Sequence, residues 1–425
     1  MKKALIITYY WPPAGGSGVQ RWLKFVKYFR DFGIEPIVYT VEYPNYPIVD
    51  ESLSKDIPKG IEILTQPIWE PNNLFAFFGK KKTESAGFLN PNPTLFGKIL
   101  QYIRANYFIP DARKYWVKPS TSYLKKYLKA NKIDVVITTG PPHSMHLIGL
   151  NLKKELNIKW IADFRDPWTE IDYFQQLPLT KMAIEKHHSL EKEVLKNADA
   201  VLVVGKTMQE NFSKFNSKVI TVTNGFDEVL THENVALDPK FTVTHIGLMN
   251  ADRNPKMLWE VLAEIVSENE EFSMDFDLKL IGQADVSVIA DISKYRLSKN
   301  VKIKDYVTHD KVVEFQHKSQ VLLLIVNNVP SAKGILTGKI FEYLMAKRPI
   351  LAIAPSNGDV SEIINETNSG VVIDFGDKVA LKKAILEYYS KFKLGNLTVE
   401  SKNISQFHRK ELTKKVSELI YKITG

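Results

Sequence analysis

Short apolar segments rich in β-branched residues recur along this chain, and a turn and then a segment with helical spacing follow each of them. Val19–Phe32 and Met182–Asn197 are two of the helical segments, because their apolar residues recur with the period of an amphipathic helix. Continuous apolar strands that alternate with such helices are typical of a parallel sheet covered on both faces. The sequence therefore predicts an α/β protein.

The alternation runs in two series, which predicts two Rossmann-like domains. The strands expected in the first series are Ala4–Tyr9, Pro36–Val41, Asp134–Thr139, Trp160–Phe164, Ala200–Gly205 and Lys218–Thr223. The strands expected in the second are Thr242–Gly247, Leu278–Gly282, Val301–Ile303, Val321–Val326, Ile350–Ala354 and Val371–Phe375. A chain of 425 residues is also too long for one compact core.

The polar stretch Glu228–Lys240 separates the two series and is interpreted as a hinge. We expect an N-terminal domain over residues 1–230 and a C-terminal domain over residues 241–400. The tail, about 406–425, has helical spacing, and we expect it to cross back onto the first domain.

Composition narrows the class of protein. The chain has no cysteine, which excludes disulfides and thiolate sites and fits a reducing compartment, and no apolar run is long enough to span a membrane. The short apolar run after Met1 is better explained by a buried strand than by a signal peptide. We expect a cytoplasmic protein. The net charge of +9 favours anionic partners, but it is spread too thinly to indicate nucleic-acid binding.

The segment Gln66–Pro93 breaks the alternation and is rich in proline, asparagine and aromatic residues. Within it, Leu74–Lys82 joins an apolar cluster to three lysines. Such a cluster can enter the surface of an anionic bilayer, which would place the protein at the inner face of the cell membrane. A partly buried insertion loop with a solvated lysine run is the alternative.

A glycine-rich turn, Pro12–Gly18, follows the first expected strand and precedes a helix that contains Arg21. Gly15 and Gly16 permit positive φ and let a ligand approach the backbone, while the helix N-terminus beyond them presents free N–H groups. The glycines do not fit the dinucleotide fingerprint G-x-G-x-x-G. A purely structural turn from strand to helix is the alternative.

Charged residues follow another expected strand in the segment Asp163–Trp168, at the edge of the sheet where ligands bind in open α/β folds. Asp166 is a candidate for function there; the alternative is a loop in which Arg165 neutralises Asp163. His143 has a similar position after the preceding strand. It is a candidate for acceptor binding or proton transfer, and helix capping is its alternative.

In the second half, Gly247 ends the first expected strand, and Arg253 stands where that strand turns into a helix with Pro255 near its start. A guanidinium at this point can clamp a diphosphate. A surface arginine paired with Asp252 is the alternative.

A second loop-to-helix segment, Lys333–Ile350, carries Lys339 at the expected start of its helix and Glu342 one turn further on. The backbone N–H groups, the helix dipole and Lys339 would converge on a phosphate, and Glu342 could accept from ribose hydroxyls. The spacing is not that of a P-loop, and charged helix starts are common.

Taken together, these segments resemble family 4 glycosyltransferases, whose GT-B architecture consists of two Rossmann-like domains facing a central cleft. Arg253-Asn254-Pro255 resembles the donor-phosphate arginine of that family, and Thr337–Ala346 resembles its Ser-Lys-x-x-Glu-Tyr-x-A helix. Asn224–Asp227 and the Gly15-Gly16 loop add to a similarity that spans Met1 to about Gly376.

The resemblance implies a nucleotide-sugar donor bound by the second domain. Arg253 and Lys339 would hold its diphosphate next to the Gly247 strand end, and Glu342 would hold the ribose. Gly15 and Gly16 would line the cleft near the transferred sugar.

The sequence departs from the family pattern at two points. Gly334 stands where many members have a sugar-contacting glutamate, which leaves the identity of the sugar open. Asp163-Phe164-Arg165 stands where an Asp-x-His pattern is usual, so Arg165 or Asp166 is expected to contact the acceptor instead, with His143 as a further acceptor-side candidate.

The resemblance also implies a retaining hexosyl transfer that depends on positioning and on electrostatic stabilisation of the leaving diphosphate. We expect no cofactor and no metal, since two cations serve the diphosphate and no DxD-like pair lies in a suitable loop. The expected acceptor is a glycan or lipid-linked oligosaccharide of surface polysaccharide synthesis. A nucleotide-sugar 2-epimerase and a non-catalytic donor-binding scaffold are the alternatives, and an NAD-dependent oxidoreductase is disfavoured because its fingerprint is missing.

Overall fold

The computed structural model describes residues 1–44, 46, 48–70, 94–172, 174–227, 235–305, 307 and 309–425. These residues form two compact units. Unit 1 comprises Met1–Asn224 together with Arg409–Gly425, and unit 2 comprises Gly225–His408. The C-terminal segment therefore belongs with the first half of the chain, and each unit is described by itself below.

In unit 1, the described strands form a parallel sheet of seven, in the order β3-β2-β1-β4-β5-β6-β7. Their bounds are β1 Lys2–Ile7, β2 Ile34–Glu42, β3 Glu62–Pro67, β4 Val135–Gly140, β5 Trp160–Phe164, β6 Ala200–Val203 and β7 Val219–Thr221. The central strands are buried along almost their whole length, because helices cover both faces of the sheet.

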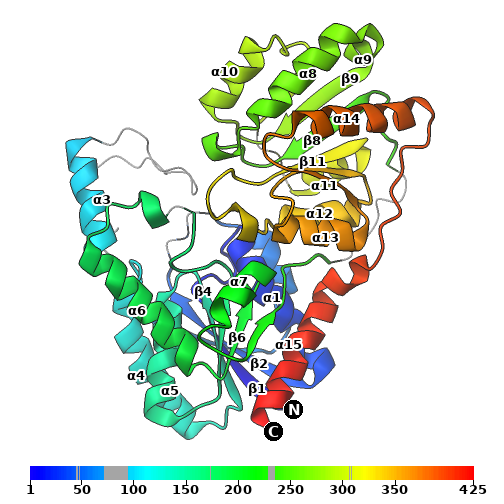
Figure 1. Cartoon of the computed structure of the whole chain (residues 1–425). Coiled ribbons are helices and arrows are strands. Elements are labelled where there is room, and N and C mark those ends of the chain that lie inside the picture. The colour runs from blue at the N-terminus through cyan, green and yellow to red at the C-terminus, as the bar shows by residue number, and fades with distance from the viewer. Residues whose placement is uncertain are drawn as a thin grey trace. The chain divides into compact units, whose positions relative to one another are not determined.

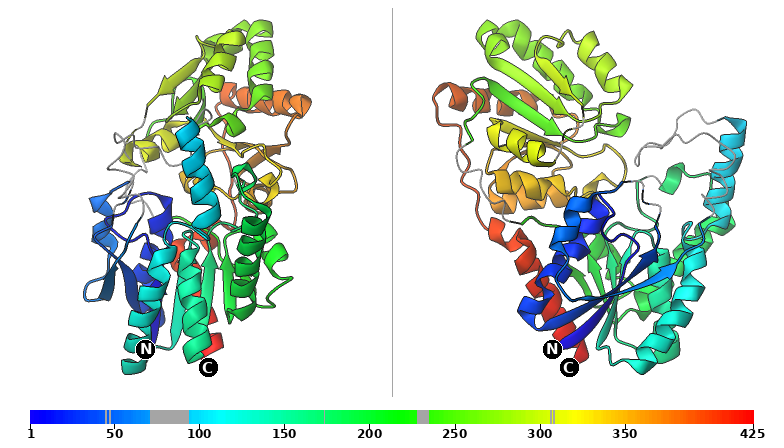
Figure 2. Two further views of the ribbon diagram at one scale, coloured as in Figure 1. Left: turned by 90° about the vertical axis from the view of Figure 1, so that its left-hand side faces the viewer. Right: turned by 180° about the vertical axis from the view of Figure 1, so that it is seen from behind.

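Helices α4 and α5 pack on one face of this sheet, and α1 and α15 pack together on the other (Figures 1 and 2). The helices of unit 1 are α1 Ser17–Phe29, α3 Leu95–Tyr107, α4 Lys114–Ala130, α5 Ser144–Leu156, α6 Lys181–Asn197, α7 Lys206–Phe212 and α15 Arg409–Thr424. The apolar face of α15 joins the core of unit 1. The two termini meet there, since Lys2 Nζ donates to the carbonyl of Gly425 at 2.9 Å.

Unit 2 contains a parallel sheet of six described strands, in the order β10-β9-β8-β11-β12-β13. Its strands are β8 Phe241–Ile246, β9 Phe276–Ile281, β10 Val301–Lys304, β11 Val321–Ile325, β12 Ile350–Ile353 and β13 Gly370–Ile373. Its helices are α8 Lys256–Glu268, α9 Glu270–Asp275, α10 Val286–Lys294, α11 His309–Lys318, α12 Lys339–Ala346, α13 Asp359–Thr367 and α14 Lys378–Lys393. The predicted fold class, two Rossmann-like α/β domains, is confirmed.

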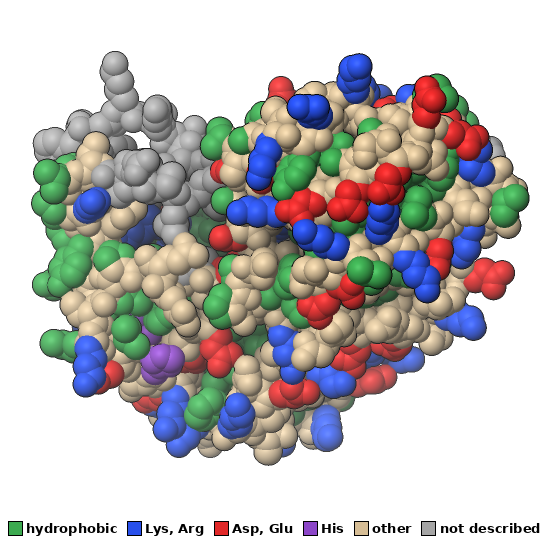
Figure 3. Space-filling view, turned by 45° about the horizontal axis from the view of Figure 1, so that its top comes forward, with side chains coloured by type: hydrophobic (Ala, Val, Ile, Leu, Met, Phe, Trp, Pro, Cys, Tyr) green, Lys and Arg blue, Asp and Glu red, His purple; other side chains and the backbone are tan. Residues whose placement is uncertain are grey.

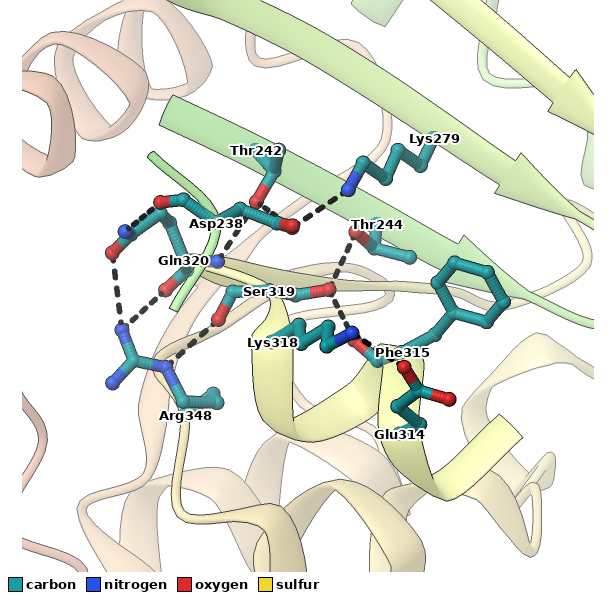
Figure 4. A network of polar contacts seen from close by, with 10 residues as sticks. All are labelled: Asp238, Thr242, Thr244, Lys279, Glu314, Phe315, Lys318, Ser319, Gln320 and Arg348. Atoms are coloured by element: carbon teal, nitrogen blue, oxygen red, sulfur yellow. Dashed lines mark hydrogen bonds and ion pairs between the residues drawn. The ribbon is translucent and has the colours of Figure 1, made fainter. Parts of the chain in front are cut away.

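A polar network holds the segment just before β8 at the amino ends of β8 and β11 (Figure 4). The Asp238 carboxylate accepts from Lys279 at 2.7 Å and from the Thr242 hydroxyl at 2.9 Å. Arg348 donates to the carbonyls of Ser319 and Gln320 in the same network. The segment predicted as a hinge, Glu228–Lys240, is therefore bound to unit 2 from Asp238 onward, while residues 228–234 lie outside the described residues.

Strand β3 was not predicted, since the irregular segment was expected to begin at Gln66, inside this strand. Its residues are exposed or half-buried because it lies at the edge of the sheet, so its sequence lacks the continuous apolar run of the central strands. Leu74–Lys82 lies outside the described residues. None of the helices in the described part of the chain combines the length and apolarity needed to cross a bilayer.

Candidate functional site

The order of the strands gives each unit one switch point. In unit 1 the chain leaves β1 toward β2 and later returns to β4 on the other side of β1. In unit 2, β8 lies in the same way between β9 and β11. Ligands of open α/β sheets bind outside the carboxyl ends of the strands at such points. The candidate residues of both halves lie at these carboxyl ends.

Asp163 is the centre of the unit 1 site. Its carboxylate is fully buried and forms an ion pair with Arg21 at 2.8 Å, and it accepts from Trp22 Nε1 at 2.6 Å and from the Thr139 hydroxyl at 2.8 Å. Burial alone would raise the pKa of Asp163, but the charge of Arg21 and these hydrogen bonds outweigh it, so the pKa is lowered. The carboxylate is therefore ionised and serves to fix α1 against β5.

Arg165 holds the three sequence motifs of unit 1 together, and it does not neutralise Asp163 as the alternative supposed. Its guanidinium donates to the carbonyl of Gly18 at 2.8 Å and to the carbonyl of Pro141, and its backbone N–H donates to Gly140. A Cβ at Gly18 would lie 2.9 Å from Arg165 Nη1, so this glycine admits the guanidinium. Sequence reasoning did not identify this role of Gly18.

The segment after Arg165 is fixed through Trp168. Its indole N–H donates to His187 Nδ1 at 3.0 Å, and its backbone N–H donates to the buried carboxylate of Glu191 at 3.1 Å. The His143 ring stacks on Trp168 with ring centroids 4.9 Å apart and planes 6° apart. Asp166, between Arg165 and Trp168 in sequence, is exposed to solvent and thus accessible to a ligand of unit 1.

The structure does not support a capping role for the side chain of His143. The N-terminus of α5 is capped by Asp111, which accepts from the Ser144 backbone N–H at 2.9 Å. Burial lowers the pKa of His143 well below its usual range, with the neighbouring His146 as a further cause, so the imidazole is neutral. Within the described residues its Nδ1 has no hydrogen-bond partner.

The two glycines of the Pro12–Gly18 turn occupy different environments. A Cβ at Gly15 would lie 2.8 Å from Ile48 Cγ2, and the Gly15 N–H donates to the Ile48 carbonyl at 2.9 Å, so this glycine permits close packing. Gly16 has φ of +86° at the start of α1, and a Cβ there would meet open space. Gly16 is therefore the point of this turn that a ligand could approach.

In unit 2, Gly247 and Lys339 come together at the carboxyl end of β8. Gly247 has φ of +110°, and a Cβ there would lie 2.6 Å from both Cε and Nζ of Lys339. Any other residue would displace the lysine, so Gly247 is required for its position. Burial and the charge of Arg253 lower the pKa of Lys339 to about 7, although Glu342 acts in the opposite direction.

Arg253 is held in place by the residues around it. The Asn250 side chain accepts from the Arg253 backbone N–H at 3.1 Å, and Arg253 Nη1 donates to the Leu248 carbonyl at 2.7 Å. The next residue, Asn254, is fixed by Trp259 Nε1 and by Asp291, both at 2.7 Å. Because the backbone and one guanidinium nitrogen of Arg253 are hydrogen-bonded and Asn254 is anchored, the guanidinium has little freedom, which is what a preformed anion site requires.

Beneath these two cations lies His245, which sequence reasoning missed. It is fully buried, and its Nδ1 donates to the Leu323 carbonyl at 3.1 Å. Burial, together with the charges of Lys339 and Arg253, lowers the pKa of His245 well below its usual range. A neutral ring here adds no third positive charge. Alternation along β8 could have indicated an inward-pointing polar residue at this position.

Glu342 lies on α12, one turn beyond Lys339, and is half-buried. Gln316 Nε2 donates to its carboxylate at 3.0 Å, which fixes its orientation. Gly334 ends a short 3-10 turn, Ala332–Gly334, five residues before α12 begins. All four donor-side candidates of the second half, Gly247, Arg253, Lys339 and Glu342, therefore lie around one strand end and one helix N-terminus.

The site of unit 2 has the chemistry of an anion site, with two cations next to the start of a helix and one carboxylate that can accept from hydroxyls. The site of unit 1 is different in kind. Its buried carboxylate Asp163 is paired with Arg21, and the groups accessible to a ligand are the backbone at Gly16 and the carboxylate of Asp166, while the neutral ring of His143 is buried.

Comparison with known families gives matches over both halves of the chain. Residues 17–229 match the family model described as Glycosyltransferase Family 4. Residues 240–391 match the family model described as Glycosyl transferases group 1. A search of curated protein sequences found no significant match.

Solved structures share the fold over the full length of the chain. Sucrose-phosphate synthase from Thermosynechococcus elongatus has 14% identity and a TM-score of 0.62, with 100% of this chain and 99% of that chain covered. Alr3699/HepE from Anabaena in complex with UDP-glucose has 12% identity and a TM-score of 0.61, with coverage of 99% and 100%. A putative UDP-N-acetylglucosamine 2-epimerase from Listeria monocytogenes has 12% identity and a TM-score of 0.56, with coverage of 99% and 96%.

Proposed function

Since this chain belongs to glycosyltransferase family 4, we propose that it transfers a sugar from a nucleotide-sugar donor, bound by unit 2, to a glycan or lipid-linked acceptor. The observation that carries this proposal is the preformed pair of Arg253 and Lys339 at the carboxyl end of β8, with Gly247 giving the lysine its space. Glycosyl transfer leaves a nucleoside diphosphate, and two fixed cations stabilise its developing charge.

In this proposal each polar group of unit 2 has one role. Arg253 and Lys339 bind the diphosphate and act without a metal or another cofactor. Glu342, oriented by Gln316, accepts from the ribose hydroxyls. Position 334 is a glycine here, so the sugar does not contact the glutamate that many family members have at this position. We propose that the transfer retains the anomeric configuration of the donor sugar. The test is the anomeric configuration of the product, measured by NMR.

On the side of unit 1 we propose that Asp166, Arg165 and His143 serve the acceptor, with the backbone at Gly15 and Gly16 near the transferred sugar. The exposed carboxylate of Asp166 can accept from an acceptor hydroxyl, and the neutral His143 can offer its ring Nδ1, unpartnered among the described residues, as a hydrogen-bonding group. Arg165 is bound to two carbonyls, so its contribution is to position the loop that carries Asp166.

We further propose that the acceptor is a lipid-linked oligosaccharide of surface polysaccharide synthesis, met at the cytoplasmic face of the membrane. The support is the apolar and lysine-rich sequence Leu74–Lys82 and the net charge of +9. Full activity on a water-soluble acceptor, equal with and without lipid vesicles, would argue against this acceptor.

Calorimetric titration of the full chain with UDP-, GDP- and ADP-sugars and with NAD tests which donor the protein binds. We expect one nucleotide-sugar to bind and NAD not to bind. A turnover assay that measures nucleotide release then distinguishes a transferase from a donor-binding scaffold. Binding without release in the presence of varied glycan acceptors would favour the scaffold, and binding of NAD alone would refute the proposal.

Donor binding is expected to take up protons near neutral pH. The pKa of Lys339 is lowered to about 7, and a bound diphosphate favours the ammonium form. Below pH 7 the lysine is already charged, whereas above it binding must also protonate it, so affinity falls with rising pH by up to about tenfold per unit. Titrations at pH 8 in buffers of different ionisation enthalpy measure the uptake.

The control for this measurement is Lys339→Arg, which stays protonated at all these pH values. The variant should bind the nucleotide-sugar without proton uptake and with an affinity that no longer depends on pH between 6 and 8, about one unit on either side of the lysine pKa. Equal proton uptake in the wild type and in the variant would assign the titration to another group.

A further inference from the structure

Helix α3 of unit 1 carries a row of large apolar side chains that are exposed in the described part of the chain. None of its residues is buried. Leu95, Phe96, Ile99, Ile103 and Tyr107, which we call the α3 stripe, are between 37% and 82% exposed. Hydrophobic side chains gather at the left-hand edge of Figure 3, where Figure 1 places this helix. Exposed apolar residues in a contiguous group, unlike single ones, indicate a binding surface.

The charges on α3 are arranged around this stripe. At about 100° per residue, the residues of the stripe fall on one side of the helix, and Lys98 and Arg104 fall on its two opposite edges. The helix contains no acidic residue. An apolar face bordered on both sides by cations is typical of helices that lie in the interface of a bilayer with anionic lipids.

Aromatic and cationic side chains continue the surface beyond the end of α3. Trp69 and Tyr115 are exposed and form an edge-to-face pair with ring centroids 4.9 Å apart. Lys114 Nζ lies 5.5 Å from the centre of the Phe108 ring and 5.1 Å from that of Tyr115. Tryptophan and tyrosine next to lysine are the residues enriched at the level of lipid headgroups.

The C-terminal end of α3 is attached to the rest of unit 1. Asn106 donates to the Pro178 carbonyl at 2.8 Å and accepts from the Thr180 backbone N–H at 2.7 Å, at the start of α6. The helix is thus held at one end by polar contacts, and its apolar residues take no part in the hydrophobic core of unit 1.

We propose that α3 binds an anionic phospholipid bilayer. The α3 stripe would enter the acyl-chain region just below the headgroups, and Lys98, Arg104 and Lys114 would contact the headgroup phosphates. Charge favours this occupant over a second copy of the chain, because two α3 helices would bring only cations together. The proposal rests on the proposed function, whose acceptor is met at the membrane, and it names the surface of unit 1 that contacts the lipid. It also needs no contribution from Leu74–Lys82.

Sedimentation of the full chain with vesicles tests the proposal, with phosphatidylcholine vesicles that contain either no phosphatidylglycerol or about a third. We expect the wild type to bind the anionic vesicles more tightly and to be released by salt. The variant Ile99→Gln/Ile103→Gln is expected to lower the partition coefficient at least about tenfold, because both side chains would otherwise enter the apolar phase.

The matched control is Val286→Gln/Ile289→Gln, which replaces two exposed apolar residues of α10 in unit 2 and should leave vesicle binding unchanged. Leu74–Lys82 is intact in all variants, so a selective loss identifies α3. Nucleotide-sugar binding, measured by calorimetry, should be equal in all of them, which separates this test from that of the donor site.

Two results would overturn the proposal: a wild type that does not bind anionic vesicles, or an α3 variant that binds them as well as the wild type does. If neither protein binds vesicles and light scattering shows a wild-type dimer that becomes a monomer in the α3 variant, the stripe is assigned to a second copy of the chain.

Discussion

Replacement of Lys339 by alanine is expected to lower kcat/KM for sugar transfer by roughly ten- to a hundredfold, and Arg253→Ala should have an effect of similar size. In the proposed function each side chain stabilises the diphosphate as it leaves, and a hydrogen bond to a charged group contributes about 1.5–3 kcal/mol. The fold should persist, because Lys339 is half-buried and has no ion pair within the described residues, so its removal leaves no buried charge unpaired.

Initial rates at saturating acceptor, with circular dichroism to verify the fold, provide the measurement. Lys383→Ala is the control, since Lys383 is an exposed lysine of α14 in the same unit whose partner, Glu387, is also on the surface. Its kcat/KM should equal that of the wild type. An unchanged kcat/KM in purified Arg253→Ala and Lys339→Ala would refute the assignment of the donor diphosphate site.

The donor side was predictable because its residues are close in sequence to the elements that position them. Arg253 follows β8 directly, and Lys339 begins α12, so strand and helix signals were sufficient to place both at a carboxyl edge. The contact of Gly247 with the Lys339 side chain was not predictable, because it joins residues far apart in sequence. The neutral His245 beneath the two cations was also missed. Alternation along β8 indicates an inward-pointing side chain at this position, but its proximity to Arg253 and Lys339 is not visible in the local sequence.

On the side of unit 1, sequence reasoning located the segments but not the partners of the charged residues. Asp163 and Arg165 are two residues apart, and a loop in which they neutralise each other was the alternative to a functional role. In the structure Arg21 reaches Asp163 from α1 with 2.8 Å between charged atoms, and Arg165 binds backbone carbonyls instead. Which cation reaches a buried carboxylate depends on how α1 packs on the sheet, and periodicity does not reveal that packing.

Substitution of Asp163 by asparagine is expected to destabilise unit 1 by about 3–5 kcal/mol, because it leaves the buried guanidinium of Arg21 without its counter-charge. The side chains of this ion pair are 2% and 0% exposed, so solvent does not screen the loss. Arg21 also donates to the Thr223 carbonyl at 2.8 Å, so an unpaired Arg21 would disturb the segment after β7 as well as α1.

Chemical denaturation followed by tryptophan fluorescence measures this effect. Six of the 7 tryptophans lie in the sequence of unit 1, and Trp259 is the one in unit 2, so the signal reports mainly on unit 1. Glu35→Gln is the matched control. Its ion pair with Arg30 has a distance of 2.6 Å, but the side chains are 28% and 35% exposed, so its loss should cost less than about 1 kcal/mol.

The pH dependence of the destabilisation and a second substitution show whether the unpaired buried charge causes it. The pKa of Asp163 is lowered below 3.8 in the folded state, so its stabilisation is present above that pH and is lost only as pH falls through the lower, folded value. The difference between wild type and Asp163→Asn should therefore be constant near neutral pH and shrink in strong acid. Arg21→Met/Asp163→Asn should be more stable than Asp163→Asn alone, since it removes the unpaired guanidinium. If the double variant is no more stable, the cost arises from lost hydrogen bonds to Trp22 and Thr139 and not from the buried charge.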